Sequence, residues 1–141
     1  MNLNPISVRN PKLCPIDPES KKRFGCFVTF RRNDFYISDE LWIRMEYPEY
    51  VRFAIDESNT IIGICKTDAE DPFGIAIKMQ ENGGVKGTGH RNVLDKIVQA
   101  LPYIIDLDNE NFTFYRGFKA DEYVCFETKS SVKKPIKRRK K

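Results

Sequence analysis

Residues 25–37 of the chain, GCFVTFRRNDFYI, hold two short runs of aromatic and β-branched residues with a polar turn between them. Such runs on either side of residues 31–33 predict two antiparallel strands joined in a β-hairpin. Ser38 follows directly and suits the start of a helix, because its hydroxyl can accept a hydrogen bond from a free backbone N–H. Pro48 then limits that helix to about two turns, since proline cannot donate within a helix.

The same alternation of strands and turns continues along the chain. Residues 50–55 (YVRFAI) and 60–65 (TIIGIC) flank a polar turn and predict a second hairpin. Residues 73–79, FGIAIKM, predict a strand with one buried face, because Phe73, Ile75, Ile77 and Met79 alternate with other residues. Apolar residues at helical spacing over 93–101 predict a helix. Its expected cap is Asn92, and later strands are expected at residues 103–107, 112–118 and 122–127.

These elements predict an α+β, mostly β fold in a globular body over residues 21–128. An offset of 54 residues aligns Ser38 with Asn92 and Pro48 with Pro102. We therefore expect two short-helix β-α-β-β modules, about residues 24–80 and 85–128, that share one core. Residues 1–20 contain four prolines and predict an extended proline-containing arm.

The chain has 141 residues and a formal net charge of +4, but the charge is unevenly distributed. Residues 129–141, KSSVKKPIKRRKK, contain eight of the 24 lysines and arginines and no acid. This leaves 16 basic against 20 acidic residues in the rest of the chain. We expect the last 13 residues to form a disordered basic tail, because they lack apolar periodicity and repel one another. Nucleic acid should bind this tail in a salt-dependent way.

Residues 26–66 contain a strand, a basic turn, a strand, a short helix, a strand, an acidic turn and a strand. This layout resembles the AbrB-type swapped-hairpin family of transcription regulators, and a repeat at residues 87–126 would match tandem MraZ-like members. The chain departs from the family at the helix entrance, where Ser38 replaces the usual proline. The resemblance implies a swapped-hairpin-like barrel or pseudo-dimer, or a homodimer. It also implies DNA contacts by Arg31 and Arg32 in the first hairpin.

The first functional hypothesis is a nucleic-acid-binding regulator or accessory protein. The glycine-rich residues 83–92, GGVKGTGHRN, precede a predicted helix and could expose backbone N–H groups and basic side chains to an anion. A flexible hairpin loop is the first interpretation of that stretch, and the contact with an anion is the alternative. The candidate phosphate-contacting residues are Arg31, Arg32, Lys86, His90, Arg91, Lys133, Lys134, Lys137, Arg138 and Arg139.

The second hypothesis is a small protein-binding inhibitor or adaptor of viral or mobile-element type that acts through an acidic and aromatic face. Its candidate interface residues are Trp42, Tyr47, Tyr50 and Arg52. Packing in the core is the alternative interpretation of the aromatic residues among them. A later aromatic group could instead stack bases of a single strand. That group consists of Phe112, Phe114, Tyr115, Phe118 and Tyr123.

Catalysis, metal binding and cofactors find little support in the sequence. Cys14, Cys26, Cys65 and Cys125 are widely spaced, and there is only one histidine, so we expect free thiols, no metal site and no cofactor. An enzyme that uses His90 as a general base remains a third interpretation. No apolar run approaches the roughly 20 residues of a membrane-spanning helix, so we expect no membrane contact. The expected location is intracellular, cytoplasmic or, in a eukaryotic host, nuclear.

Overall fold

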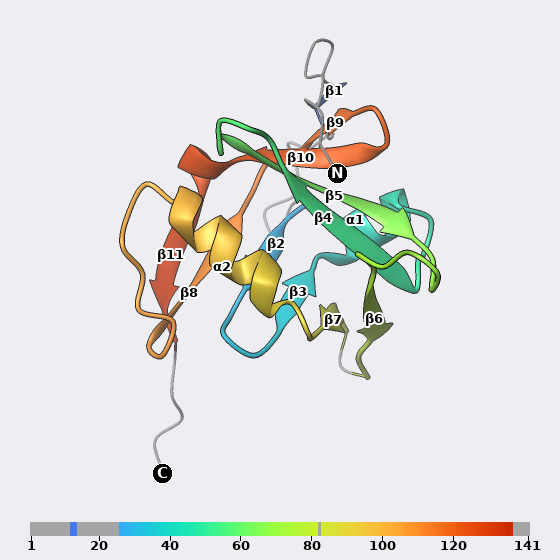
Figure 1. Ribbon diagram of the computed structural model, residues 1–141. Coiled ribbons are helices and arrows are strands. Elements are labelled where there is room, and N and C mark those ends of the chain that lie inside the picture. The colour runs from blue at the N-terminus through green and yellow to red at the C-terminus, as the bar shows by residue number, and fades with distance from the viewer. Residues whose placement is uncertain (1–11, 14–25, 82, 137–141) are drawn as a thin grey trace, which may run out of the picture.

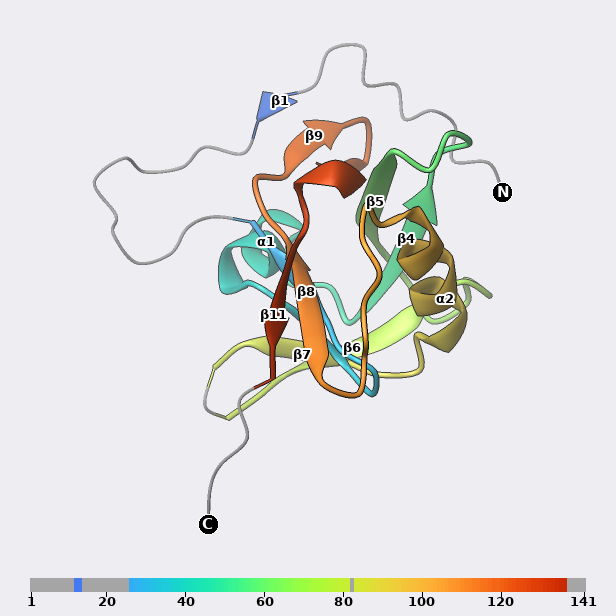
Figure 2. The same ribbon diagram turned by 90° about the vertical axis from the view of Figure 1, so that its left-hand side faces the viewer.

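The computed structural model describes residues 12–13, 26–81 and 83–136, with side chains described from residue 26 onward. Strands in this part of the chain form one antiparallel sheet in the order β1-β9-β10-β5-β4-β6-β7-β3-β2-β8-β11. The sheet curls into an open half-barrel (Figures 1 and 2). The mostly β, α+β fold is therefore confirmed.

The bounds of the elements follow. The strands are β1 Lys12–Leu13, β2 Val28–Phe30, β3 Phe35–Ile37, β4 Tyr50–Ile55, β5 Ile61–Thr67, β6 Ile75–Met79, β7 Val85–Gly87, β8 Glu110–Phe114, β9 Phe118–Ala120, β10 Tyr123–Glu127 and β11 Val132–Pro135. The helices are α1 Asp39–Arg44, α2 Arg91–Ala100 and the short 3-10 helix η1 Thr128–Ser130. Neither α1 nor α2 has the length and apolar character that crossing a membrane demands, and no other described helix does.

The first predicted hairpin is present as β2 and β3. Phe30 lies opposite Phe35 in the register, and the turn closes with a hydrogen bond from the Arg31 N–H to the Asp34 carbonyl. Ser38 caps α1 as expected, because its Oγ accepts the backbone N–H of Leu41 at 3.2 Å. The same oxygen also accepts the N–H of Phe27 at 3.1 Å, so one hydroxyl joins the helix start to the residue that precedes β2.

The second predicted hairpin is present as β4 and β5. Their register runs from Tyr50 opposite Thr67 to Ile55 opposite Ile62. The side chain of Asp56 holds the turn, because its carboxylate accepts hydrogen bonds from the Thr60 N–H at 2.7 Å and the Ile61 N–H at 3.0 Å. Local residue chemistry thus fixes both hairpins.

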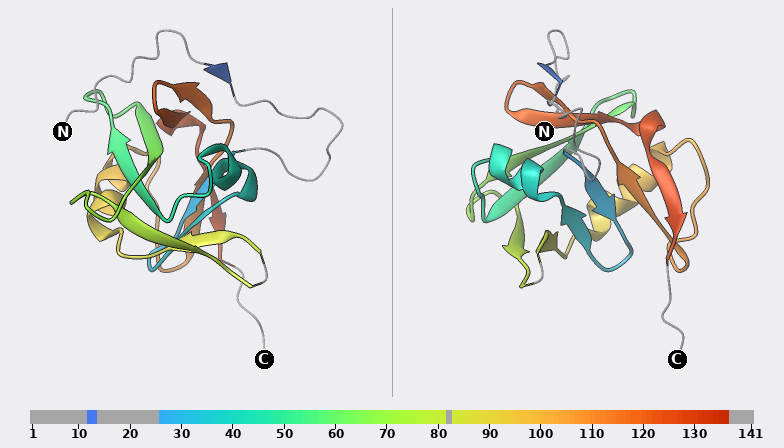
Figure 3. Two further views of the ribbon diagram at one scale, coloured as in Figure 1. Left: turned by 90° about the vertical axis from the view of Figure 1, so that its right-hand side faces the viewer. Right: turned by 180° about the vertical axis from the view of Figure 1, so that it is seen from behind.

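The core fills the inside of the curled sheet. The side chains of Phe30, Phe35, Phe112 and Phe114 are 0% exposed, because alternate residues of each strand point inward. Leu94 and Ile97 of α2 belong to the same buried cluster, and α2 lies beside the half-barrel against β4 (Figures 1 and 3). Both halves of the chain contribute to this one core.

The predicted internal repeat is not reproduced in its second copy. Residues 103–107, expected as a strand, have no regular structure, and Ile104 there is 90% exposed. The expected strand over residues 112–118 is divided between β8 and β9, with Arg116 at a positive φ of 62° between them. The described residues form one continuous sheet in which β8 joins β2 rather than a second equivalent module.

The glycine-rich stretch differs from the flexible loop expected of it. Only the turn at Gly83 and Gly84, both with positive φ, behaves as a hairpin loop. Val85–Gly87 form β7, which pairs with β3 on one side and β6 on the other. The missing side chain of Gly87 explains the difference, because an added Cβ there would lie 2.6 Å from the Cε1 atom of the buried Phe35 ring.

Two further local expectations are wrong. Helix α2 begins at Arg91 with His90 at the cap position, so Asn92 lies inside the first turn. On β6 only Ile77 is buried, at 8% exposure, while Phe73 and Met79 are exposed. Residue 73 precedes the strand and residue 79 ends it, so neither is held against the core.

The expected boundary of the disordered tail at residue 129 is also wrong. Thr128–Ser130 form η1, and Val132–Pro135 form β11, paired antiparallel with β8. The free edge of β8 supplies backbone partners that the sequence of the tail does not reveal. The last described residue is Ile136, whose N–H donates to the Asn109 carbonyl at 2.9 Å. Residues 137–141 and nearly all of the predicted arm over residues 1–20 lie outside the described residues.

Candidate nucleic-acid interface

The outer face of the sheet carries a row of side chains that the register brings together. Thr29 lies opposite Tyr36, Tyr36 opposite Lys86, and Lys86 opposite Lys78, on β2, β3, β7 and β6. The neighbours of these residues along each of the first three strands point into the core, so the row itself faces outward. Neighbouring strands are about 4.8 Å apart, so the row extends for about 14 Å. We call these four residues the Tyr36 row.

Positive charge surrounds the ring of Tyr36. The Arg31 guanidinium carbon lies 5.1 Å from the ring centroid, and the Lys86 ammonium lies 5.9 Å from it. Asp34 holds both cations: its carboxylate accepts two hydrogen bonds from Arg31, at 2.8 and 3.2 Å, and lies 3.5 Å from Lys86. The hydrogen bonding of the Arg31 guanidinium to the Asp34 carboxylate is the main reason why the pKa of Arg31 is raised. The cluster keeps a net positive charge, since two cations face one carboxylate.

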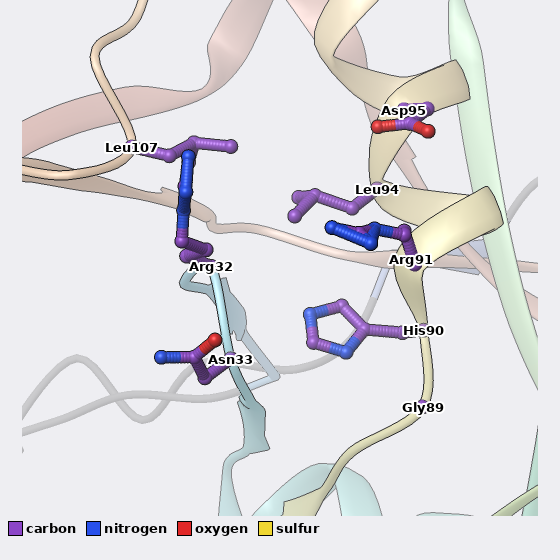
Figure 4. A pocket seen from close by; sticks show the side chains of 8 residues that line it. All are labelled: Arg32, Asn33, Gly89, His90, Arg91, Leu94, Asp95 and Leu107. Carbon is purple, nitrogen blue, oxygen red and sulfur yellow. The ribbon is translucent and has the colours of Figure 1, made fainter.

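A second group of basic residues lies at the turn of the same hairpin. Arg32 and Asn33 of the turn face Arg91 and Asp95 of α2 across a hollow of about 420 Å³ (Figure 4). Arg32 pairs with Asp108 at 3.1 Å, but both side chains are more than half exposed, so water and salt weaken this pair. Arg91 is exposed and has no ion pair with the described residues. Both guanidinium groups are therefore accessible to an anion.

His90 lies at the base of this hollow but belongs to the core. Its ring is 2% exposed and packs edge-on to Phe35, with 5.0 Å between the ring centroids. Nε2 lies 3.1 Å from the carbonyl oxygen of Arg31, and Nδ1 has no hydrogen-bond partner among the described residues. Burial lowers the pKa of the imidazole, so the ring is neutral at pH 7. The structure thus places His90 as a link between α2 and the hairpin, with little surface for contact with a phosphate.

The start of the basic tail lies beside this hairpin turn. Because β11 runs antiparallel to β8, the chain leaves the sheet at Ile136, which bonds to Asn109. The adjacent Asp108 is the partner of Arg32. Figure 1 shows the β2–β3 turn, the start of α2 and the end of β11 on the same lower side of the molecule. We call Arg31, Arg32, Arg91 and the chain exit at Ile136 the basic end.

The two lysines of β11 have different surroundings. Lys133 donates to the Ile104 carbonyl at 3.1 Å, lies over the Tyr103 ring and is 3.8 Å from Glu110. Lys134 is exposed and lies opposite Asn111, on the outward face of the sheet. Lys134 is therefore the freer of the two for a phosphate. The predicted Lys137, Arg138 and Arg139 lie outside the described residues.

The residues predicted for a protein interface lie elsewhere. The Trp42 indole packs edge-on to Tyr47, with centroids 5.1 Å apart, and its Nε1 donates to a backbone carbonyl at 3.0 Å. Tyr47 is 60% exposed. Tyr50 is half-buried in β4, and the guanidinium of Arg52 is shared between Asp71 and Glu122. Of this set, Tyr47 presents the largest fraction of its side chain to a partner.

The later aromatic group does not form a stacking platform. Phe112 and Phe114 are 0% exposed in the core, and Phe118 and Tyr123 are buried on the other face of the sheet. Only Tyr115 of that group is partly exposed. The sequence shows the aromatic residues but not which of them alternate inward, because that depends on the strand pairing. It is Tyr36, not singled out from the sequence, that lies on the open face.

Groups suited to catalysis or metal binding are scarce in the described part of the chain. Cys65 and Cys125 are buried thiols whose pKa values burial raises, for Cys125 to about 12. Neither is a thiolate near neutral pH, and a thiolate is the reactive form. No cluster of at least three histidine, cysteine, aspartate or glutamate residues within the described ranges could hold a metal ion.

Searches against protein-family models, curated proteins and solved structures find no match to this chain. Function is therefore inferred from the geometry of the chain itself. The arrangement of the Tyr36 row and the basic end is the main feature from which to infer it. It combines cations held in place, an aromatic ring among them and an exit point for a basic tail.

Proposed function

We propose that the protein binds nucleic acid as a regulator or accessory protein, with phosphate contacts from the hairpin arginines and the basic tail. One observation carries this proposal: the register of β11 on β8 places Ile136, the last described residue, beside the hairpin turn. Five consecutive basic residues, numbers 137–141, follow that residue. Cations far apart in the sequence can thus act on one stretch of a phosphate backbone.

The distribution of charge supports this site over a general attraction. Residues 1–128 carry 16 basic and 20 acidic residues, so most of the body repels a polyanion. Arg91 has no ion pair with the described residues, and the exposed pair of Arg32 with Asp108 is worth about 0–1 kcal/mol. A phosphate can therefore replace the carboxylate at small cost. The basic end would bind, and the rest of the surface would orient the ligand by repulsion.

Fluorescence anisotropy with labelled DNA and RNA, at about 50 and about 200 mM salt, tests the proposal. The full-length protein is compared with K137S/R138S/R139S/K140S/K141S and with the double variant R32A/R91A. Truncation at residue 128 is unsuitable because it would remove β11. We expect both variants to bind more weakly and to show a smaller dependence on salt, since each lost phosphate contact lowers the slope of log K against log salt by about 0.7–0.9.

A matched control is Arg44→Ala, because Arg44 is a partly exposed arginine of α1 that pairs only with Glu40 among the described residues. It should bind like the parent. If the tail variant loses all binding while R32A/R91A binds like the parent, the body takes no part and the joint site is refuted. If the parent binds none of the probes at about 50 mM salt, the proposed function fails as a whole.

A protein-binding inhibitor or adaptor is the second candidate. It is favoured by two exposed apolar side chains at the end of α1, Ile43 at 51% and Tyr47 at 60% exposure. Apolar and aromatic side chains of this kind anchor protein interfaces. Cross-linking and mass spectrometry in host extract tests this function. A partner that is lost on Tyr47→Ser and retained on Arg32→Ala would support it, whereas a partner retained by Tyr47→Ser would exclude this surface.

A further inference from the structure

We infer that the nucleic acid bound by this protein is single-stranded, and that one base stacks on the Arg31–Tyr36 pair at the outer face of the sheet. This inference rests on the proposed function and specifies its ligand. Sequence-tolerant binding of single strands combines a positively charged track with aromatic rings on which bases stack. The Tyr36 row has both parts on one face.

The geometry of the row fits a strand that lies across the sheet. Tyr36 is half-buried, with Lys86 opposite it on β7 and Lys78 one strand further on β6. The two lysines follow the ring at intervals of one strand spacing, about 4.8 Å. Lys78 is exposed and has no ion pair with the described residues. A base on the ring would therefore place the adjoining phosphates near two ammonium groups.

Arg31 is held in a position that suits stacking. Two hydrogen bonds to Asp34 fix its guanidinium beside the Tyr36 ring, and Asp34 itself is only 6% exposed. Bases stack on guanidinium planes as well as on aromatic rings. Because Asp34 already orients the side chain, little conformational entropy remains to be lost on binding. Arg31 also belongs to the basic end, so the row and the tail exit form one continuous surface.

Within the described ranges of the chain, no element is suited to enter the major groove of a duplex. A helix or a free two-stranded ribbon normally does so. The β2–β3 hairpin is not free, since β8 pairs with β2 and β7 pairs with β3. Helix α1 has only six residues and begins with Asp39 and Glu40, whose carboxylates would repel the phosphates of a duplex. Helix α2 carries Arg91 at its first residue, but Leu94 and Ile97 hold it against the core, and Lys96 is its only other basic residue. A flexible single strand can instead follow the curved face.

Acidic residues at the start of α1 limit where a bound strand can run along the sheet. A hollow of about 400 Å³ lies beside Tyr36 at the start of α1 and is lined by Phe27, Asp39 and Glu40 among others. Its two carboxylates disfavour phosphates there, while the opposite end of β3 leads to Arg31 and the basic end. A bound strand would thus run from Lys78 past Tyr36 toward the hairpin turn and avoid the hollow.

The test compares labelled single-stranded DNA and RNA of about 20 nucleotides with a duplex of about the same length, by anisotropy on the full-length protein. Tyr36→Leu should weaken single-strand binding by roughly fivefold or more, because one base stack is lost. Tyr36→Phe keeps the ring and should bind within about twofold of the parent. Tyr47→Leu removes an exposed tyrosine outside the row and is the matched control. Circular dichroism confirms that each variant folds.

The salt dependence of binding tests the lysines of the row independently of the Tyr36 ring. Lys78→Gln should lower the slope of log K against log salt by about 0.7 for single strands. Lys96→Gln, an exposed lysine of α2 outside the row, should leave it unchanged.

The outcomes separate this inference from the proposed function. Tighter binding of single strands than of duplex, with a selective loss on Tyr36→Leu, supports the inference. Equal binding of single strands and duplex that Tyr36→Leu leaves unchanged overturns it. The proposed function would then stand if R32A/R91A still weakened binding. If no probe binds at about 50 mM salt, the proposed function and this inference both fail.

Discussion

Replacement of Gly87 by alanine tests whether β7 is the packed strand that holds Lys86 beside Tyr36. A Cβ at this position would lie 2.6 Å from Phe35 Cε1, closer still to Cζ and 3.0 Å from Ile77 Cγ2. Phe35 has no room to withdraw, because it is 0% exposed and packs against the rings of Phe53 and His90 at centroid distances of 5.2 and 5.0 Å. The added methyl group therefore overpacks the core.

The magnitude follows from two opposing contributions. Overpacking in a dense core costs about 1–3 kcal/mol, and the rigid surroundings of Phe35 favour about 3. Alanine in place of glycine recovers about 0.5–1 kcal/mol through the lower entropy of the unfolded chain. Gly87→Ala should thus lower the free energy of unfolding by about 2 kcal/mol. For a chain of 141 residues this corresponds to a midpoint about 7 °C lower in thermal unfolding.

Differential scanning calorimetry and urea unfolding measure this change. Thr88→Ala, at the exposed next residue, is the control and should stay within about 0.5 kcal/mol of the parent. The double variant F35L/G87A should be less destabilised than the two single changes predict together, because leucine vacates the space that the new methyl group needs. A Gly87→Ala protein that melts within about 2 °C of the parent would show that β7 does not pack on Phe35.

Three further expectations concern single side chains. Ser38→Ala should lower the free energy of unfolding in urea by about 1–2 kcal/mol, because the Ser38 Oγ accepts from the backbone N–H groups of Leu41 and Phe27. An unchanged urea midpoint would contradict this. The pKa of the His90 imidazole is lowered in the folded protein. As pH falls below about 6.5, the unfolded chain therefore binds a proton at His90 more readily than the folded protein does, and the free energy of unfolding should decrease toward acid. His90→Gln should flatten that pH dependence between about pH 7 and 5, and an equal slope would refute the assignment. Cys125, with its pKa raised to about 12, should resist alkylation by iodoacetamide at about pH 8 until urea unfolds the chain, as peptide mass spectrometry would show.

The sequence predicted the elements whose cause is local. The β2–β3 hairpin, the Ser38 cap and the β4–β5 hairpin all follow from residues that contact neighbours a few positions away. The same reasoning missed β11 and β7. Each of these strands is stabilised by partners far away in the chain: β8 for β11, and β3 for β7. Their own sequences, rich in lysine and glycine, favour irregular structure.

Some residues of the candidate site could likewise be identified from the sequence, and others could not. Arg31, Arg32 and Arg91 stand out in the sequence because basic residues in a turn and at a helix start are typical phosphate contacts. Tyr36 did not stand out, because one tyrosine in a strand is ordinary and its importance comes from Arg31 and Lys86 beside it. Sequence reasoning instead proposed the later aromatic residues, of which the strand register turns Phe112 and Phe114 into the core, while Phe118 and Tyr123 are buried on the other face of the sheet.

The sequence by itself determined that this protein is mostly β, where the β2–β3 and β4–β5 hairpins turn, and that its positive charge is concentrated at the C-terminal end. These properties depend on side-chain chemistry within a few residues. Only the tertiary structure decided which aromatic residues face outward and that β11 and Ile136 lie beside the turn that carries the hairpin arginines. A shift of one residue in a strand exchanges its two faces, and the pairing that fixes the register comes from distant strands. The residue types of the site can therefore be identified in the sequence, whereas their arrangement depends on pairing between distant strands.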